Sequence, residues 1–143
     1  MSEPPFGGRL FIADTSAHHR ADDRRVRDEW IAAYEQGTLL SCLVVRFELL
    51  YSARNVGEFE EIDSNLGDLR DVPITVSVQR AAIAAMRQLA ERGQHRVKLS
   101  DLLIAAAAQE AAVGVLHCDA DFDLLATVLS FESRWLVRDT DDA

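Results

Sequence analysis

The amino-acid sequence predicts an α/β fold in which helices cover both faces of a central parallel sheet. Short apolar runs alternate with longer segments of helical periodicity along the chain, and parallel strands joined by crossover helices produce that alternation. The 143 residues suit one domain that can bury a core. We expect residues 1–8, which hold two prolines and two glycines, to form a flexible leader, and residues 9–143 to form a single domain.

The first half of the chain contains two expected strands and three expected long helices. Each strand is a short apolar run, and each helix repeats apolar residues every three or four positions. Val26, Trp30 and Tyr34 share one face of the first long helix, and Gly37 ends it. The expected strands are 9–13 and 38–42, and the expected helices are 22–36, 44–54 and 56–69, with a turn into a short helix at 14–20.

The second half begins with an edge strand, because Pro73 cannot donate a hydrogen bond to a neighbouring strand. The long helix that follows ends at Gly93. Ser100 is the expected N-cap of the next, alanine-rich helix, and Gly114 is expected to end it. The expected strands here are 71–75, 113–118 and 134–137, and the expected helices are 76–92, 100–113 and 122–129.

Composition bears on the compartment and on the partners. No apolar run approaches the roughly 20 residues of a membrane-spanning helix, and the N-terminus lacks the pattern of a signal peptide. Cys42 and Cys118 sit inside apolar runs, as buried thiols do in a reducing compartment, so we expect a cytoplasmic protein without a membrane contact. The net charge of −9 argues against a broad nucleic-acid-binding face. A local basic rim stays open, because arginines cluster at Arg20, Arg24, Arg25 and Arg27.

Acidic residues fall where a parallel sheet would bring them together. Asp14 and Asp119 each follow an expected strand, and Asp101 begins a helix whose positive end favours a carboxylate. Glu48 lies one turn into the helix after the second strand. Ligand sites of open parallel sheets lie outside the carboxyl ends of the strands. These acids, with Asp121 next to Asp119, are therefore the candidate site.

Each acid taken alone has a plain structural explanation. Asp14 can cap the next turn, Asp101 can be a helix-start residue, and Glu48 can reach solvent. Together, however, clustered carboxylates cannot all stay ionised without a cation, and oxygen ligands suit Mg²⁺ or Mn²⁺. A calcium loop beginning at Asp119 is excluded, since Leu124 and Ser130 stand where such a loop needs glycine and glutamate.

Four segments resemble the acidic motifs of PIN-domain proteins, most closely the VapC-type toxins of toxin–antitoxin pairs. They are "FIADTSA" (11–17), "RFELLYSAR" (46–54), "KLSDLLIAAAA" (98–108) and "VLHCDADFDLL" (115–125). The last two are the most specific. His117 departs from the pattern, because a threonine or serine is usual at that position.

The resemblance implies a three-layer fold with strand order 3-2-1-4-5 and a Mg²⁺- or Mn²⁺-dependent ribonuclease. Its partners would be an RNA substrate, a cognate antitoxin and a second copy of the chain in a homodimer. Thr15 and Ser16 would support Asp14 or touch substrate, and Asp123 falls outside the shared pattern. Carried over by position, the catalytic acids would be Asp14, Glu48, Asp101 and Asp119, and the metal ligands these four with Asp121.

A second class of function stays open beside the nuclease. The acidic pocket could belong to a non-catalytic interaction module that binds a basic partner. A phosphatase-like hydrolase is a weaker alternative, because the sequence has no glycine-rich phosphate loop. The behaviour of the acids toward divalent metal distinguishes the first two classes.

Overall fold

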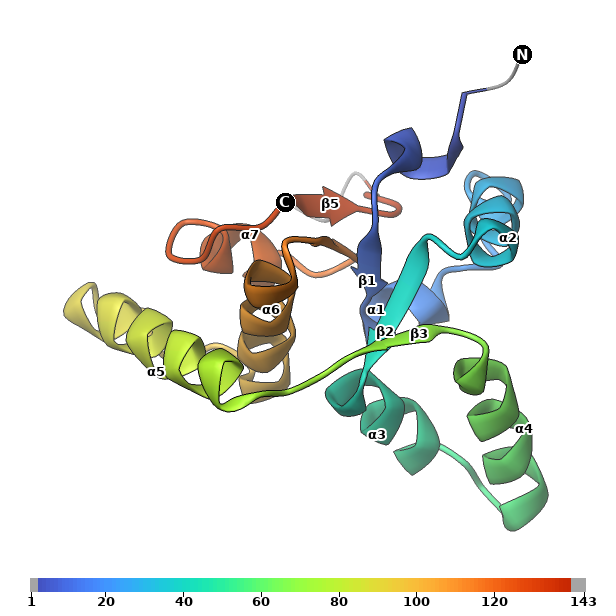
Figure 1. Ribbon diagram of the computed structural model, residues 1–143, viewed down its shortest axis with the longest axis horizontal. Helices are drawn as coiled ribbons and strands as arrows, with labels where there is room; N and C mark the ends of the chain where they lie inside the picture. Colours follow the sequence, from blue (N-terminus) through green and yellow to red (C-terminus); the bar gives the residue numbers. More distant parts are fainter. Residues whose placement is uncertain (1–2, 140–143) are drawn as a thin grey trace.

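A computed structural model describes residues 3–139 and contains one five-stranded parallel sheet (Figure 1). The strand order is β3-β2-β1-β4-β5, and each neighbouring pair is parallel. This confirms the predicted α/β class and the strand order that the resemblance implies. The strands are β1 (Phe11–Ala13), β2 (Leu39–Cys42), β3 (Arg70–Val72), β4 (Gly114–His117) and β5 (Ser133–Trp135).

Seven α-helices connect the strands within the described residues. Figure 1 shows α5 and α6 to one side of β1 and β2, with α2 to the other. Side chains cap three of the described helices: Asp14 accepts a hydrogen bond from the Ser16 N–H, Asn55 from the Glu58 N–H, and Thr75 from the Val78 N–H. No helix of the described chain combines the length and the apolar character that crossing a bilayer requires. The helices are α1 (Thr15–His19), α2 (Arg27–Gln36), α3 (Leu43–Tyr51), α4 (Val56–Gly67), α5 (Val76–Glu91), α6 (Leu99–Ala111) and α7 (Asp121–Leu125).

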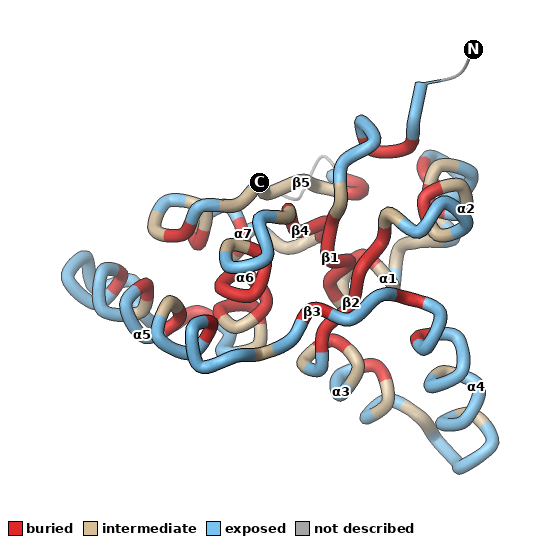
Figure 2. Tube along the Cα trace, viewed as in Figure 1, coloured by how far each residue is buried: buried red, intermediate tan, exposed pale blue. Residues whose placement is uncertain are grey.

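The core lies between the central strands and α6. Figure 2 shows β1, β2 and β4 buried along their length, whereas α5 is buried on one side only. Helix α6 contacts β1, β3 and β4, and its residues 105–108 are all alanines with no exposed surface. Small side chains allow the helix to approach the sheet closely, so the alanine run reflects packing as well as helix propensity.

Gly114 has a different role from the helix stop that the sequence predicts. Ala112, with φ of 56°, adopts the left-handed conformation that ends α6, and Gly114 is the first residue of β4. A Cβ atom on Gly114 would lie 2.6 Å from Phe11 Cε1 and 2.9 Å from the Glu132 carbonyl oxygen. Packing between β1 and β5 therefore requires a glycine at this position.

The N-terminal boundary of the domain is earlier than residue 9. Pro5–Gly8 forms a 3₁₀ turn, η1, and Phe6 is buried edge-on against Phe11 with ring centroids 6.5 Å apart. The Phe6 N–H also donates to the Glu29 carboxylate at 2.9 Å. An aromatic side chain buried in the core anchors this segment, so residues 5–8 do not form the flexible leader that their proline and glycine content predicts.

Several other boundaries shift by a few residues. Helix α2 begins at Arg27 rather than residue 22, because Asp23 accepts hydrogen bonds from the Arg25 backbone and side chain and holds a turn there. Strand β3 ends before Pro73, which cannot take part in the ladder. Helix α7 ends at Leu125, four residues earlier than expected.

Candidate metal centre

Three aspartates form a compact group of carboxylates. Asp119 and Asp121 follow β4, and Asp101 lies in the first turn of α6. Each offers a carboxylate oxygen, and these oxygens all lie within 4.8 Å of one another. The group thus brings together three of the five acids that the sequence predicts as ligands. A cluster of hard oxygen donors at this spacing suits Mg²⁺ or Mn²⁺.

Asp14 lies beside this group at the end of β1, and it is almost completely buried. Its Oδ2 accepts hydrogen bonds from the Ser16 N–H at 3.1 Å and the Ser16 hydroxyl at 2.6 Å. Ser16 Oγ in turn accepts from the Cys118 N–H at 2.8 Å, which ties the start of α1 to the end of β4. Asp14 therefore caps α1, and its charge also raises the pKa of Asp101 in the neighbouring group. Burial raises its pKa, and the Ser16 hydrogen bonds oppose that rise.

Glu48 lies at the rim of the site rather than in the compact group. It is exposed on α3, and its Oε1 accepts a hydrogen bond from Thr15 Oγ1 at 2.9 Å. Its negative charge adds to the effects that raise the pKa of Asp14. Because Thr15 and Asp14 are adjacent, this contact holds Glu48 beside the acid cluster.

Asp101 carries the least compensated carboxylate of the group. It is 4% exposed, and within the described chain its Oδ2 is buried without a hydrogen-bond partner. Burial, followed by the charges of Asp14 and Asp119, raises its pKa to about 8. A buried oxygen without a donor is costly unless a cation meets it. The expected N-cap is wrong: α6 begins at Leu99, and Ser100 lies inside the first turn, so no side chain caps this helix.

Lys98 is a neighbour of the acid cluster that is not among the site residues predicted from the sequence. Its Nζ lies 2.8 Å from Asp119 Oδ2, on the rim of the acid cluster. Although burial works against it, this hydrogen bond and that of the Asp121 N–H hold the pKa of Asp119 below its usual value. The available signal was that the chain's single lysine is the first residue of the third motif.

The residues after β4 are held by side chains from α7 and β5. His117 is completely buried, and burial lowers its pKa to about 4, so it is neutral near pH 7. Its Nδ1 accepts from the Asp119 N–H at 3.2 Å, and its Nε2 lies 2.7 Å from Ser133 Oγ. Asp123 stays outside the compact group, as predicted, yet it accepts hydrogen bonds from Ser133 and Trp135. No local sequence pattern pointed to these contacts.

Two of the four clustered arginines are paired with acids of the chain itself. Arg20 lies 3.2 Å from Asp23 and 3.1 Å from Asp139. Arg25 lies 2.8 Å from each of the same two carboxylates. The charges of Arg20 and Arg25 are therefore balanced within the protein, while Arg24 and Arg27 are exposed to solvent.

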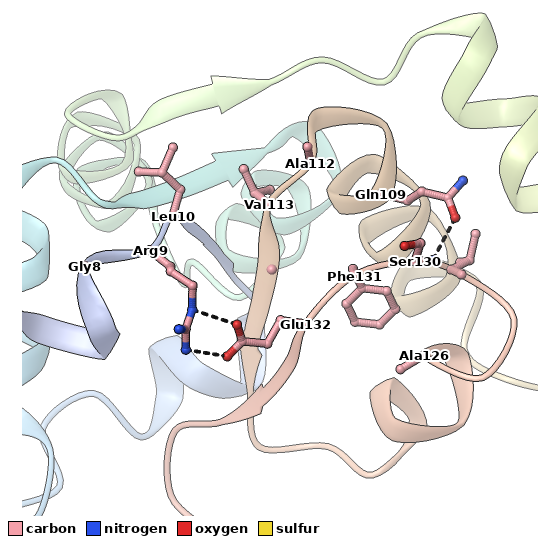
Figure 3. A pocket seen from close by; sticks show the side chains of 12 residues that line it. Gly8, Arg9, Leu10, Gln109, Ala112, Val113, Ala126, Ser130, Phe131 and Glu132 are labelled. Atoms are coloured by element: carbon pink, nitrogen blue, oxygen red, sulfur yellow. Dashed lines mark hydrogen bonds and ion pairs between the residues drawn. The ribbon is translucent and has the colours of Figure 1, made fainter.

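A cavity of about 760 Å³ lies at the opposite edge of the sheet, where β1, β4 and β5 begin (Figure 3). Its charged lining residues, Arg9 and Glu132, pair with each other through contacts of 2.8 and 3.0 Å. The side-chain amide oxygen of Gln109 accepts a hydrogen bond from the Ser130 N–H across the rim. The described residues that line the cavity include no convergent acids and no unpaired titratable side chain, so the candidate chemistry lies at the carboxyl edge.

Comparison with known proteins identifies relatives over most of the chain. The PIN domain family matches residues 11–128. Ribonuclease VapC51 of Mycobacterium tuberculosis is 37% identical over 127 residues, which cover 89% of this chain and 93% of the relative. Ribonuclease VapC18 of the same organism is 34% identical over 131 residues, 90% of this chain and 96% of the relative.

Solved structures share the fold at lower sequence identity. DNA-bound VapBC from Salmonella typhimurium aligns with a TM-score of 0.75 and 14% identity, covering 90% of this chain and 99% of that one. VapBC2 from Rickettsia felis, bound to a promoter DNA fragment, aligns with a TM-score of 0.70 and 16% identity, covering 87% and 98%. These similarities establish the fold independently of the sequence motifs.

Proposed function

Because the chain belongs to the PIN-domain family, we propose that it is a metal-dependent endoribonuclease toxin that a cognate antitoxin neutralises. Its curated relatives VapC18 and VapC51 are ribonucleases and align with about nine-tenths of its length. The observation that carries the proposal is the compact carboxylate group of Asp101, Asp119 and Asp121, with the unpartnered Oδ2 of Asp101 inside it.

The proposed metal is Mg²⁺ or Mn²⁺. Its ligands would be Asp101, Asp119 and Asp121, with Asp14 and Glu48 beside them, directly or through water. When bound, the ion supplies stabilisation of the charge that develops on the phosphate and activation of the attacking water. The residues fit such an ion, because each offers a carboxylate oxygen and Asp101 Oδ2 is buried without a hydrogen-bond partner among the described residues.

The protein's own residues would position the carboxylates and handle protons. Ser16 holds one oxygen of Asp14 through two hydrogen bonds. Asp101, whose pKa is about 8, carries a proton near neutral pH and would release it when the site is loaded. Glu48 or Asp119 would orient the attacking water. No protein nucleophile is required in this scheme.

The exposed apolar side chains support protein partners. Leu43, Phe47 and Tyr51 follow one another at four-residue spacing on α3 and are 46%, 62% and 92% exposed, so they form one apolar face. Phe59 of α4, which packs beside α3, is also exposed. Patches of this kind mark interaction sites, and we propose an antitoxin and a second copy of this chain as the partners. We propose the cytoplasm as their location.

Cleavage of RNA under metal control tests the proposed activity. The wild-type protein should cleave a mixed RNA pool with Mg²⁺ or Mn²⁺, lose activity in EDTA, and recover it when metal is restored. Asp14→Asn and Asp101→Asn should be inactive. Asp28→Asn, an exposed aspartate on α2 away from the site, is the matched control and should retain activity. Full activity of Asp101→Asn in excess chelator would contradict the proposal.

The alternative, a non-catalytic acidic module, predicts different behaviour toward metal. In that case Mn²⁺ would bind the wild-type and Asp14→Asn proteins equally, and RNA would stay intact under all conditions. A nuclease centre predicts weaker Mn²⁺ binding after the loss of Asp14. Titration of both proteins with Mn²⁺ therefore separates the two functions.

A further inference from the structure

A continuous chain of hydrogen bonds leads from the acid cluster to the edge strand β5. We propose that His117 is a positioning residue: it fixes the turn that carries Asp119 and Asp121, and its own orientation is fixed by Ser133 and Asp123. The affinity of the centre for a divalent ion then depends on side chains that never touch the ion. This inference rests on the proposed function, because it concerns the same metal centre.

The direction of each hydrogen bond follows from chemistry. The backbone N–H of Asp119 can only donate, so His117 Nδ1, 3.2 Å away, is the acceptor. A neutral imidazole that accepts at Nδ1 carries its hydrogen on Nε2. Nε2–H therefore donates to Ser133 Oγ at 2.7 Å, and the Ser133 hydroxyl donates to Asp123 Oδ1 at 2.7 Å. Because the Asp123 carboxylate can only accept, every hydrogen bond in this series donates toward Asp123.

Packing holds the imidazole in the plane that these bonds need. The ring stacks on Phe122 with centroids 4.9 Å apart and an interplanar angle of 27°. Trp135 packs edge-on against the same ring, with centroids 5.2 Å apart. The indole N–H of Trp135 donates to Asp123 Oδ2 at 2.9 Å. The aromatic neighbours and the acceptor are thus fixed to each other as well as to His117.

The turn beyond His117 transmits this arrangement to the ligands. Asp119 Oδ1 accepts a hydrogen bond from the Asp121 N–H at 2.9 Å, so a displacement of the Asp119 backbone would move both carboxylates. These are two of the three acids in the compact group. Partners of this kind typically change metal affinity by about 10- to 100-fold when removed.

A purely structural role for His117 is the competing explanation. A fully buried imidazole that joins β4 to β5 could contribute to folding stability alone. The two roles predict different results in variants that still fold, because a structural residue changes the melting temperature without changing the affinity for metal.

Two amide substitutions divide the functions of the ring. In His117→Asn, the amide oxygen lies near the position of Nδ1 and can still accept the hydrogen bond from the Asp119 N–H. Gln places its amide near the place of Nε2, so it can still reach Ser133 but loses the acceptor for Asp119. Ser133→Ala removes the next group in the series of hydrogen bonds, the hydroxyl that accepts from His117 and donates to Asp123. Ser64→Ala, an exposed serine on α4, is the matched control.

The experiment is calorimetric titration of EDTA-treated, desalted protein with Mn²⁺, with circular dichroism to establish that each variant is folded. We expect His117→Gln to weaken Mn²⁺ binding by about 10- to 100-fold, and His117→Asn and Ser133→Ala to weaken it less. Ser64→Ala should match the wild type. The effects of His117→Gln and Ser133→Ala should be non-additive in the double variant, because both interrupt one chain.

Folded His117→Gln and Ser133→Ala proteins that bind Mn²⁺ as tightly as the wild type would overturn the inference and leave the proposed function intact. A wild-type protein that binds no Mn²⁺ would overturn both. If His117→Gln weakens Mn²⁺ binding but its effect adds to that of Ser133→Ala in the double variant, then Ser133 does not act through His117, and its role in the hydrogen-bond series is overturned.

Discussion

Charged side chains are paired at one edge of the sheet, whereas like charges crowd together at the other. At the edge where β1, β4 and β5 begin, Arg9 and Glu132 neutralise each other in partly exposed positions, and Gly114 allows tight packing. At the carboxyl edge, carboxylates crowd together, and Asp101 is buried without a donor for one oxygen. A protein that gained only stability from its charges would not retain the second arrangement. The difference supports the proposal that the carboxyl edge binds a cation, whereas the opposite edge contributes to stability.

The largest effect should come from removing charge at the carboxyl edge. Asp101→Asn should reduce metal-dependent RNA cleavage by at least about 100-fold, since loss of a ligand exceeds the loss of a partner that merely supports one. The melting temperature in EDTA should stay equal or rise, because the substitution removes a buried carboxylate. Rates of RNA cleavage and thermal melts check the two effects. A large drop in melting temperature would place Asp101 among the stabilising residues instead.

A substitution at the opposite edge should do the reverse. Gly114→Ala would place a Cβ atom 2.6 Å from Phe11, and such overpacking costs about 1–3 kcal/mol of unfolding free energy. Its Mn²⁺ affinity should be that of the wild type. Gly67→Ala is the control, because open space surrounds Gly67 and its φ is not positive; chemical denaturation should show it equal to or more stable than the wild type. If Gly114→Ala and Gly67→Ala are equally stable, close packing at Gly114 does not contribute to the stability of this edge.

The pH dependence should also differ between the edges. Asp101 has a pKa of about 8 when folded and an ordinary value of 3.8 when unfolded, so between these pH values the folded state binds more protons. Stability in EDTA should therefore fall as the pH rises toward 8, and the raised pKa of Asp14 acts in the same direction. Mn²⁺ affinity should rise by up to about tenfold per pH unit over that range, because binding displaces a proton.

Titration of the buried His117 limits the pH range in which the change in stability can be attributed to Asp101. The pKa of His117 is lowered from 6.5 to about 4 by burial, so its contribution to stability is present above pH 6.5 and is lost as the pH falls below that value. Thermal melts in EDTA are therefore best compared from pH 6.5 to 8. The slope there should be smaller in Asp101→Asn, and an unchanged slope would show that Asp101 does not titrate in this range.

The smallest effect should come from the exposed ion pair. Arg9 and Glu132 side chains are 56% and 41% exposed, and such pairs contribute about 0–1 kcal/mol. Glu132→Gln should therefore change the unfolding free energy by less than about 1 kcal/mol and leave Mn²⁺ affinity unchanged. Denaturant titration measures the first quantity, and calorimetry measures the second.

Features tied to the chain's periodicity and motifs were predictable from the sequence. Apolar strands ending at Asp14 and Asp119, and a helix starting near Asp101, placed the acids at one edge before the structure did. Features that depend on distant contacts were not predictable. Phe6 is buried by a core formed from later segments, and Ser133 is identified only once β5 pairs with β4. Proline and glycine content near Phe6 predicted a flexible segment and could not indicate the tertiary contacts that anchor residues 5–8.

His117 shows the same limit at the site itself. The sequence marked it as a departure from the family pattern, but its hydrogen bond to Ser133 joins residues 16 positions apart. Lys98 is similar, since its partner Asp119 is 21 positions away. Motif spacing identifies the carboxylates, while the contacts that orient them join segments far apart in the chain, as Ser16 with Cys118 and His117 with Ser133 do.

The most direct test of the central claim, that the carboxyl edge is a divalent-cation site, is the thermal shift produced by Mn²⁺. The melting temperature of EDTA-treated, desalted protein is measured with and without excess Mn²⁺, for the wild type and for Asp101→Asn. At a metal concentration of 100 times Kd, binding stabilises a folded protein by about 2.7 kcal/mol. We predict a clear rise in melting temperature for the wild type and a much smaller one for Asp101→Asn. Equal shifts in both proteins, or no shift in the wild type, would contradict the account.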